Sequence, residues 1–400
     1  MKYNPHISIE EAILRINAGK IVIVTDDEAR ENEGDFIMAA DCVTPEAINF
    51  MITHGRGLVC VSATTEKLDK MKIPLMAASN TARLGTAFTV SIDALQGTTT
   101  GISAQDRCET IRQFCSPQAT LEQFGVPGHI FPLRAQNGGV LRRSGHTEAS
   151  SDLAALAGYN PIGILCEILN ADGTMARVPD LEKLAEEHQL GICTVADLIS
   201  YRRRTECLIK ETVVVDMPTE FGNFKLHLFE SCIDEQYHLA FVLGNPKADE
   251  PTLVRVHSEC LTGDIFHSLR CDCGSQLKSA MNMISEAGCG VLLYMRQEGR
   301  GIGLKYKLQA YKLQEAGLDT VDANIKLGFA PDLRDYGFGA QMLKALGLNK
   351  IKLLTNNPCK IAGLSGYNVE VVERIPLKVS CNKHNKKYID TKIEKFGHLD

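Results

Sequence analysis

The sequence has no apolar run of the roughly 20 residues needed to cross a lipid bilayer, and its longest apolar runs have the length of β-strands. Its start, MKYNPHISIE, lacks the apolar stretch of a secretory signal. No period of 20 to 50 residues repeats and no low-complexity tract is present, which argues against a solenoid or a flexible tail. We therefore expect a cytoplasmic enzyme without a membrane partner.

An excess of positive charge is also absent. The formal net charge of -6 argues against a general affinity for nucleic acid, although phosphate ligands remain compatible with it. The 14 cysteines are spread along the chain, mostly in apolar runs such as GILCEIL around Cys166, as expected for buried thiols in a reducing compartment. Only Cys260, Cys271 and Cys273 have a spacing that calls for a chemical explanation.

The length and composition predict two globular domains. A chain of 400 residues exceeds what one hydrophobic core usually organises. Apolar residues make up 44% and charged residues 23%, the balance of a globular protein. The segment YRRRTE at 201–206 follows the helical TVADLIS and looks like a charged break between domains. We therefore predict domains over residues 1–202 and 203–400.

The first domain is predicted to mix helices with strands. Ser8 and Glu11 form a capping box that begins a helix, and Gly19 ends it. A buried strand at 21–25 runs directly into the charged loop DDEARENEGD. A second strand at 163–169 precedes the helical segment DLEKLAEEH.

The second domain shows the same mixture. We expect strands at 212–217, 224–229, 239–244, 252–257 and 291–295, and helices at 275–288 and 304–317. The predicted fold class is therefore α/β in the broad sense (mixed α+β), with two tandem domains that each pack helices on a mixed sheet.

The loop after the first strand concentrates acidic residues beside Arg30. Such crowding is costly unless a cation or a substrate group is held there, but a solvated acidic turn is the simpler alternative. Residues 142–148, Arg-Arg-Ser-Gly-His-Thr-Glu, stand at the start of a helix, where free N–H groups make a phosphate cradle. His146 lies within this cradle; it could be structural, or it could bind a metal with the acidic loop. Oxygen ligands with one imidazole favour Mg²⁺ or Mn²⁺.

The segments DDEARENEGD, GHIFPL, RRSGHTEAS and CEILNADGTMAR, in this order over residues 1–200, closely resemble 3,4-dihydroxy-2-butanone 4-phosphate synthase. The resemblance implies conversion of ribulose 5-phosphate to formate and a four-carbon phosphate with a divalent cation, which stabilises an enediolate. It implies that Glu31 and His146 bind the metal. It further implies a substrate site made of Arg30, Glu31, Asp35, Arg143, Ser144, Gly145, His146, Thr147 and Glu167.

Within that site the resemblance assigns several roles. Arg30, Arg143 and Thr147 would grip the sugar phosphate. Asp35 is the candidate for proton transfer, and His129 and Glu167 would act in the later rearrangement and loss of formate. Ser144 stands where a smaller Ala or Gly is expected and could add a hydroxyl near the phosphate.

In the second domain, Cys260, Cys271 and Cys273 form a C-x(10)-C-x-C pattern. Cysteines one residue apart are poorly placed to bond each other, but both can reach one metal ion. Three thiolates fit tetrahedral zinc with the fourth position left for water. Two alternatives stay open: a structural site completed by His257 or His267, and an iron–sulfur site completed by Cys289.

The segments around these cysteines suggest the substrate. RVHSE at 255–259 ends a strand just before the first cysteine, and the glycine-rich RQEGRGIGL at 296–304 could hold a triphosphate, although glycines at this spacing often only make a turn. Together with LRCDCG, LGFAPDLRDYGFGAQML and LLTNNP, they resemble GTP cyclohydrolase II over nearly all of residues 207–400. The resemblance implies attack of a zinc-activated water at C8 of guanine, with release of formate and pyrophosphate.

By the same match, Asp332 would accept a proton, Tyr311 would position the substrate and Arg334 would be the nucleophile towards the phosphates. Because the pKa of arginine lies above 12, we favour Arg334 as a phosphate contact. Cys359 stands where a basic residue is expected; it could be a thiol of no consequence. The implied GTP contacts are Arg255, Val256, His257, Ser258, Glu259, Gln276, Glu298, Gly299, Arg300, Thr320, Thr355 and Lys360.

Three functional readings follow. The favoured one is a bifunctional enzyme of riboflavin biosynthesis with ribulose 5-phosphate and GTP as substrates. In the second, one half has lost activity and serves as a regulatory or dimerisation module, which the intact motifs of both halves argue against. In the third, a zinc module binds nucleic acid, which the net acidity argues against. By family analogy we expect a homodimer with the synthase sites near the subunit interface.

Overall fold

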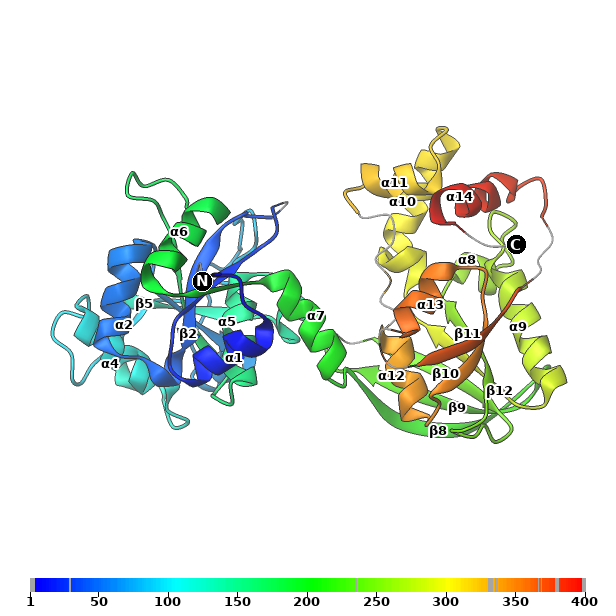
Figure 1. Cartoon of the computed structure of the whole chain (residues 1–400), viewed down its shortest axis with the longest axis horizontal. Helices are drawn as coiled ribbons and strands as arrows, with labels where there is room; N and C mark the ends of the chain where they lie inside the picture. Colours follow the sequence, from blue (N-terminus) through cyan, green and yellow to red (C-terminus); the bar gives the residue numbers. More distant parts are fainter. Residues whose placement is uncertain are drawn as a thin grey trace. The chain divides into compact units, whose positions relative to one another are not determined.

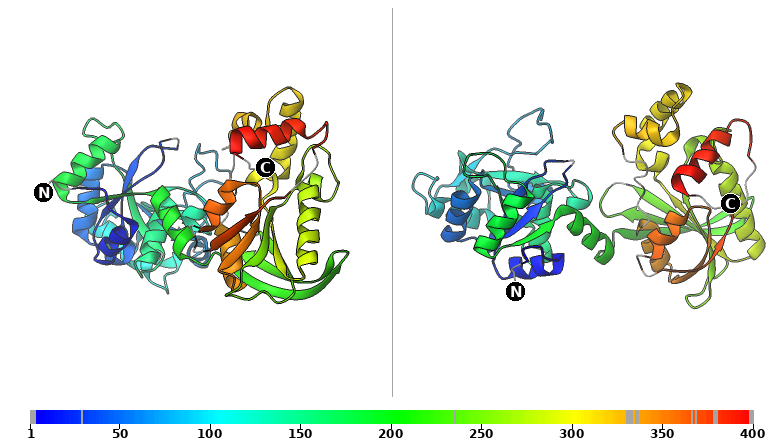
Figure 2. Two further views of the ribbon diagram at one scale, coloured as in Figure 1. Left: turned by 45° about the vertical axis from the view of Figure 1, so that its right-hand side comes forward. Right: turned by 45° about the horizontal axis from the view of Figure 1, so that its top comes forward.

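The computed structural model describes residues 4–28, 30–234, 236–329, 334, 337–365, 367, 369–377 and 381–397, and it divides the chain into two compact units, Met1–Thr205 and Glu206–Asp400 (Figures 1 and 2). The division falls three residues after the predicted residue 202 and still within the segment YRRRTE. Most of this segment is helical rather than a loop. It forms the end of helix α7 (Val195–Thr205) and puts Arg202, Arg203 and Arg204 in the last turn. Positive charge there is favoured by the helix dipole, so the charged segment extends the helix.

The first unit is built on a seven-stranded sheet in the order β4-β5-β3-β6-β2-β1-β7. The pairs β1–β7 and β3–β5 are parallel and the other pairs are antiparallel, so the sheet is mixed. Its strands are β1 (Val22–Thr25), β2 (Gly34–Ala39), β3 (Cys60–Thr64), β4 (Ile92–Ala94), β5 (Phe124–Ala135), β6 (Ile162–Glu167) and β7 (Gly191–Thr194).

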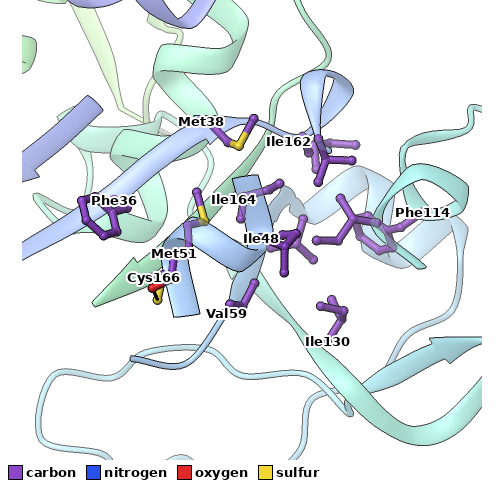
Figure 3. Packing of buried hydrophobic residues seen from close by; sticks show 14 of the residues in the cluster. Phe36, Met38, Ile48, Met51, Val59, Phe114, Ile130, Ile162, Ile164 and Cys166 are labelled. Atoms are coloured by element: carbon purple, nitrogen blue, oxygen red, sulfur yellow. Dashed lines mark hydrogen bonds between the residues drawn. The ribbon is translucent and has the colours of Figure 1, made fainter. Parts of the chain in front are cut away.

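Helices cover both faces of this sheet because side chains alternate along each strand. On β2, Phe36 and Met38 belong to one core cluster, and Ile37 and Ala39 belong to the other. Figure 3 shows part of the first cluster, where Phe114 packs near the sheet. The first face is covered by α2 (Pro45–Phe50), α3 (Thr65–Lys70), α4 (Ala104–Cys115) and α6 (Val178–His188), and the second by α1 (Ile9–Asn17), α5 (His146–Leu156) and α7.

The predicted first helix and strand are present, but only one of the two hydrogen bonds of the predicted capping box is described, since the Glu11 side chain pairs with Arg15 at 2.9 Å. Ser8 caps α1 and accepts a hydrogen bond from the backbone N–H of Glu11. The helix stops just before Gly19, whose φ of +71° lies in the left-handed region that favours glycine. Strand β1 then matches the predicted strand to within one residue.

The second unit also contains a mixed seven-stranded sheet, in the order β14-β13-β11-β12-β10-β9-β8. Its strands are β8 (Ile209–Thr219), β9 (Gly222–Ser231), β10 (Tyr237–Leu243), β11 (Thr252–Ser258), β12 (Gly290–Met295), β13 (Lys350–Leu354) and β14 (Glu370–Ile375). Its helices are α8 (Leu261–Asp264), α9 (Cys273–Ala287), α10 (Gly303–Glu315), α11 (Thr320–Lys326), α12 (Gly337–Ala345), α13 (Pro358–Ser365) and α14 (Lys386–Phe396).

Two helices of this unit cover opposite faces of its sheet. Leu292 on β12 packs in the cluster that holds α9, whereas its neighbour Leu293 faces Gly339 of α12. The predicted strands and helices of this half all have counterparts in the structure, so the predicted class of two mixed-sheet domains is confirmed. No described helix is both long enough and apolar enough to cross a membrane.

Three neighbouring parallel strands determine where the candidate site of the second unit lies. Strand β11 lies between β12 and β13 and runs parallel to both. The carboxyl ends of all three strands therefore meet at one edge of the sheet, where ligands of open α/β sheets usually bind. The segments that leave this edge are the ones that begin at Glu259, Arg296 and Thr355.

We expect Ile16→Ala to lower the free energy of unfolding of the first unit by about 2–5 kcal/mol, because Ile16 is fully buried under the sheet. The matched control is Leu14→Ala in the same helix, where the side chain is 64% exposed and the change should stay within about 0.5 kcal/mol. Urea unfolding followed by circular dichroism measures both. Equal effects of the two substitutions would contradict the buried face assigned to α1.

Candidate active site in each unit

The acidic loop of the first unit is folded around one carboxylate. The Asp26 side chain is only 1% exposed and accepts hydrogen bonds from the backbone N–H groups of Glu31 (3.1 Å) and Glu33 (3.0 Å). Arg30 contacts Asp26 at 2.7 Å and Glu31 at 2.8 Å. The loop is therefore an ordered structure and not the solvated turn of the simpler interpretation.

This loop brings carboxylates to the first residue of α5. Ligand atoms of Asp26, Glu31 and His146 all lie within 4.8 Å of one another. His146 Nδ1 lies 3.8 Å from Glu31 Oε2 and 3.7 Å from Asp35 Oδ1. The structure thus brings together Glu31 and His146, the two predicted metal ligands. Asp26 was not predicted, because the sequence does not reveal that its side chain is buried and accepts hydrogen bonds from the loop backbone.

The charges of this cluster call for a cation. The hydrogen bond with His146 lowers the pKa of Glu31, and burial raises the pKa of Asp35 to about 7. Burial also lowers the pKa of His146, but Asp35 and Glu31 outweigh it and raise that pKa to about 9. Asp35 Oδ1 and His146 Nε2 are buried without a hydrogen-bond partner. Carboxylate oxygens with one imidazole fit a hard divalent cation. Such a cation would balance the negative charge of the carboxylates in place of a protonated imidazole.

Two arginines converge at the start of α5. A Cβ atom on Gly145 would lie 2.5 Å from Arg143 Nη1 and 3.1 Å from Arg30 Nη2, so glycine is what lets both guanidinium groups approach the helix N-terminus. Arg143 is held by Glu148 (2.7 Å). Neighbouring Ser144 is exposed and Thr147 is buried. Guanidinium groups and free backbone N–H groups together make an anion site.

The two residues predicted for the later steps have different surroundings. Glu167 on β6 pairs in register with Asp35 on β2, and its Oε2 accepts a hydrogen bond from the N–H of Leu58 at 2.9 Å. His129 on β5 is bonded instead to Asp93, with 2.6 Å between Nδ1 and Oδ2, and its side chain is 43% exposed. The structure thus places Glu167 beside the acidic cluster and gives His129 a carboxylate partner that the sequence interpretation missed.

The three predicted cysteines of the second unit form one cluster. Their sulfur atoms lie within 4.8 Å of one another, and Cys260 Sγ is 3.7 Å from Cys271 Sγ. Two sulfurs bound to one tetrahedral zinc at about 2.3 Å would be about 3.8 Å apart, whereas a disulfide needs about 2.0 Å. The spacing therefore fits a shared metal and not a disulfide.

Neither alternative fourth ligand joins this cluster. His257 Nε2 is bonded to Asp264 at 3.0 Å, and His267 is exposed. Cys289 follows the far end of α9, whose 15 residues separate it from Cys273 by about 22 Å. Among the described residues the cluster thus offers three cysteine sulfurs and no fourth protein ligand, the donor set expected of a catalytic rather than a structural zinc site.

The cluster is supported by a buried lysine. Lys307 Nζ donates to Cys260 Sγ at 3.1 Å and pairs with Glu298 at 2.7 Å. Hydrogen bonds from the Cys271 and Cys273 thiols, with help from Lys307, lower the pKa of Cys260. The sequence interpretation missed Lys307, because a lysine in an amphipathic helix reads as an exposed residue.

A cavity of about 1090 Å³, including its open mouth, lies over the cysteines. Most predicted GTP contacts line it, together with Tyr311 and Arg334; the exception is Val256, whose carbonyl accepts a hydrogen bond from Lys360 at 2.7 Å. Asp332 and the side chain of Cys359 lie outside the described residues. The lining residues that sequence reasoning missed include Arg270, Lys307, Asn324, Asn357, Tyr388 and Lys392.

The cavity wall is rich in positive charge. Arg255 is fully buried, and burial lowers its pKa to about 10. Its Nη2 donates to Gln276 Oε1 at 2.6 Å, which fixes the guanidinium at the cavity wall. The guanidinium carbon of Arg270 lies 5.1 Å from the centroid of the Tyr311 ring, and the Tyr311 hydroxyl is hydrogen-bonded to the Thr262 hydroxyl at 3.1 Å. Such a wall suits a ligand that carries several negative charges.

Comparison with known proteins identifies a family for each unit. Residues 10–201 match the 3,4-dihydroxy-2-butanone 4-phosphate synthase family, and residues 210–376 match the GTP cyclohydrolase II family. The "Riboflavin biosynthesis protein RibBA" of Bacillus cytotoxicus is 56% identical, and that of Bacillus cereus 58%, each over 98% of both chains.

A solved structure extends this likeness to the fold. The crystal structure of RibBX from A. baumannii, a two-domain 3,4-dihydroxy-2-butanone 4-phosphate synthase, matches with a TM-score of 0.69 and 39% identity over 94% of this chain and all of that one. The order of the two matched families and the identity over nearly the whole chain show that the protein belongs to the bifunctional riboflavin biosynthesis family, which joins a 3,4-dihydroxy-2-butanone 4-phosphate synthase domain to a GTP cyclohydrolase II domain.

Proposed function

We propose that the first unit is a lyase that converts ribulose 5-phosphate to 3,4-dihydroxy-2-butanone 4-phosphate and formate. The second unit is a zinc-dependent hydrolase that converts GTP to 2,5-diamino-6-(5-phosphoribosylamino)pyrimidin-4(3H)-one, formate and pyrophosphate. The observation that carries this proposal is the presence of two chemically different ligand clusters, one of carboxylates with an imidazole and one of three cysteines. Beside each cluster lie positively charged side chains that could bind an anionic substrate.

In the first unit, Arg30 and Arg143 hold the sugar phosphate at the N-terminus of α5. Glu31 and His146, with Asp26 beside them, hold Mg²⁺ or Mn²⁺. When bound, the cation supplies Lewis-acid stabilisation of negative charge on the sugar oxygens. Asp35, buried and with a pKa raised to about 7, takes and returns the proton of the sugar carbon, since a base is most useful when its pKa is near the working pH.

In the second unit, Cys260, Cys271 and Cys273 hold Zn²⁺. When bound, zinc supplies Lewis-acid activation of a water molecule. Glu259 and Glu298 offer acceptors to the N–H donors of guanine, and Arg300, Arg334 and Lys360 offer donors to the phosphates. Tyr311, held in place by Thr262 and Arg270, positions the substrate between the groups that bind guanine and those that bind the phosphates.

We expect Glu31→Gln to lower formate release from ribulose 5-phosphate by at least about a hundredfold, because Lewis-acid stabilisation supplies several kcal/mol. Release of formate from GTP should not change. The matched control is Glu28→Gln in the same loop, where the side chain is exposed. Full synthase activity in the Glu31 variant, or an equal loss in the control, would refute the assigned metal ligand.

Cys271→Ser should abolish formate release from GTP and lower the zinc content of the protein, while activity on ribulose 5-phosphate stays intact. The control is Cys289→Ser, which should change neither zinc content nor activity because Cys289 follows the far end of α9. Atomic absorption and formate assays measure both effects. A loss of metal in the Cys289 variant would instead support the iron–sulfur interpretation.

Removal of metal by chelation should stop both reactions, and each should recover with its own ion. Mg²⁺ or Mn²⁺ should restore formate release from ribulose 5-phosphate, since hard oxygen ligands prefer these ions. Zn²⁺ should be needed for the GTP reaction, since thiolates prefer it. If either reaction resists thorough chelation, a metal role for that unit is wrong; if one never occurs in the untreated protein, that half is an inactive module.

A further inference from the structure

Helix α14 contributes to the cavity of the second unit although it lies beyond the segment matched to GTP cyclohydrolase II, which ends at residue 376. Tyr388 and Lys392 of this helix line the same cavity as the three cysteines. In Figures 1 and 2, α14 (red) lies beside α10 and α11 (yellow) within the second unit. The C-terminal helix is thus part of the cavity wall.

Lys392 is paired with the loop that carries two of the cysteines. Its Nζ lies 2.6 Å from Asp272 Oδ1, and the two side chains are only 13% and 5% exposed. Asp272 stands between Cys271 and Cys273 and precedes the first turn of α9. A buried ion pair at this place fixes the backbone from which both sulfurs project.

The contact continues to two further residues that line the cavity, Gln276 and Arg255. Asp272 Oδ2 accepts a hydrogen bond from Gln276 Nε2 at 2.7 Å, and Gln276 Oε1 accepts one from Arg255 Nη2 at 2.6 Å. A single chain of buried polar groups therefore joins Lys392 on α14 to Arg255 on β11. Such chains hold each member in one geometry, because every group would be costly to leave unpaired.

A second ion-pair cluster attaches α14 to α11. Lys395 Nζ lies 2.5 Å from Asp319 Oδ2 and 2.9 Å from Asp322 Oδ1. Asp319 caps the N-terminus of α11, directly before the predicted GTP contact Thr320. Helix α14 thus bridges the cysteine loop and the start of α11.

Between these attachments, Tyr388 is held with its ring under the Lys392 ammonium, 4.7 Å from Nζ to the ring centroid. The phenol lines the cavity, so its hydroxyl can serve as a donor or acceptor to a bound molecule. A substitution by phenylalanine would remove this hydroxyl and keep the ring in place.

We propose that α14 forms an essential wall of the GTP site, in which Lys392 is a positioning residue that orders the cysteine loop and Arg255 through Asp272, and Tyr388 contacts the substrate. This inference rests on the proposed GTP cyclohydrolase function of the unit. It assigns roles to two residues outside the predicted substrate contacts, which all lie before residue 361.

The first test compares Lys392→Met with Lys386→Met, an exposed lysine of the same helix. Removal of Lys392 leaves a buried carboxylate unpaired, so we expect at least about a tenfold loss in kcat for GTP and weaker GTP binding by calorimetry, with zinc retained. The Lys386 variant should match the wild type. If Lys392→Met stays within about twofold of the wild type in both kcat and affinity, the proposal is overturned.

A double variant separates positioning from a general loss of stability. Asp272→Asn combined with Lys392→Met removes the unpaired charge and keeps an acceptor for Gln276. It should recover most of the kcat lost in Lys392→Met, because removing both charges of a pair costs less than removing one. No recovery, in a variant with wild-type zinc content and Tm, would show that Lys392 does not act through Asp272.

If Lys392→Met loses zinc or fails to fold, Tyr388→Phe provides an independent test of whether α14 forms part of the GTP site. It keeps the ring under Lys392, and loss of one hydrogen bond to the substrate should lower kcat/KM and the affinity for GTP about fivefold. An unchanged value then overturns the proposed wall. If the wild-type chain releases no formate from GTP, the proposed function fails instead, and the calorimetric GTP affinities of the same variants still test the wall.

Discussion

Repulsion between like charges is the constraint on which both sites depend. In the first unit, the carboxylates of Asp26, Glu31 and Asp35 lie around His146 and raise its pKa to about 9. In the second unit, three sulfurs lie within 4.8 Å of one another, and the buried ammonium group of Lys307 donates a hydrogen bond to one of them, Cys260 Sγ, at 3.1 Å. Groups so arranged are expensive to bury unless a cation neutralises them, so each fold must be strong enough to hold its ligands together before the ion arrives.

The two sheets supply that strength in different ways. The first unit takes its ligands from a loop between two neighbouring strands and from the start of α5, so the site forms where α5 packs on the sheet. The second unit places its site at the shared carboxyl edge of β11, β12 and β13. In each unit one ligand-bearing segment directly follows a hydrogen-bonded strand, β1 before Asp26 and β11 before Cys260, and the other ligands stand at or near the start of a helix, α5 or α9. These anchors limit how far repulsion can push the ligands apart.

Much of this architecture could be predicted from the sequence, because local patterns encode it. Apolar runs of strand length marked the strands, Ser8 three residues before Glu11 marked the start of the first helix, and the cysteine spacing marked the cysteine cluster. The division of the chain falls within YRRRTE, the segment taken as the boundary, although most of that segment is the end of a helix, where arginines are favoured.

The residues that sequence reasoning missed share a different property. Asp93, Lys307 and Lys392 act through partners far away in the chain, and a lysine or aspartate in an amphipathic pattern looks the same whether it is solvated or buried in an ion pair. The spacing of residues within a motif can identify ligands that lie close together in the sequence. It carries no information on the tertiary contacts that hold such ligands, so these residues emerge only from the folded structure.

The contact of Lys392 with Asp272 has a consequence for the order of events during synthesis. The described contacts of the Asp26, Glu31 and His146 cluster all fall within the first unit, which can fold while the ribosome is still translating the second. The cysteine loop, in contrast, acquires its partner on α14 only when the last few turns of the chain have emerged. The pairing of the cysteine loop with α14 is therefore among the last contacts that the second unit can form during translation.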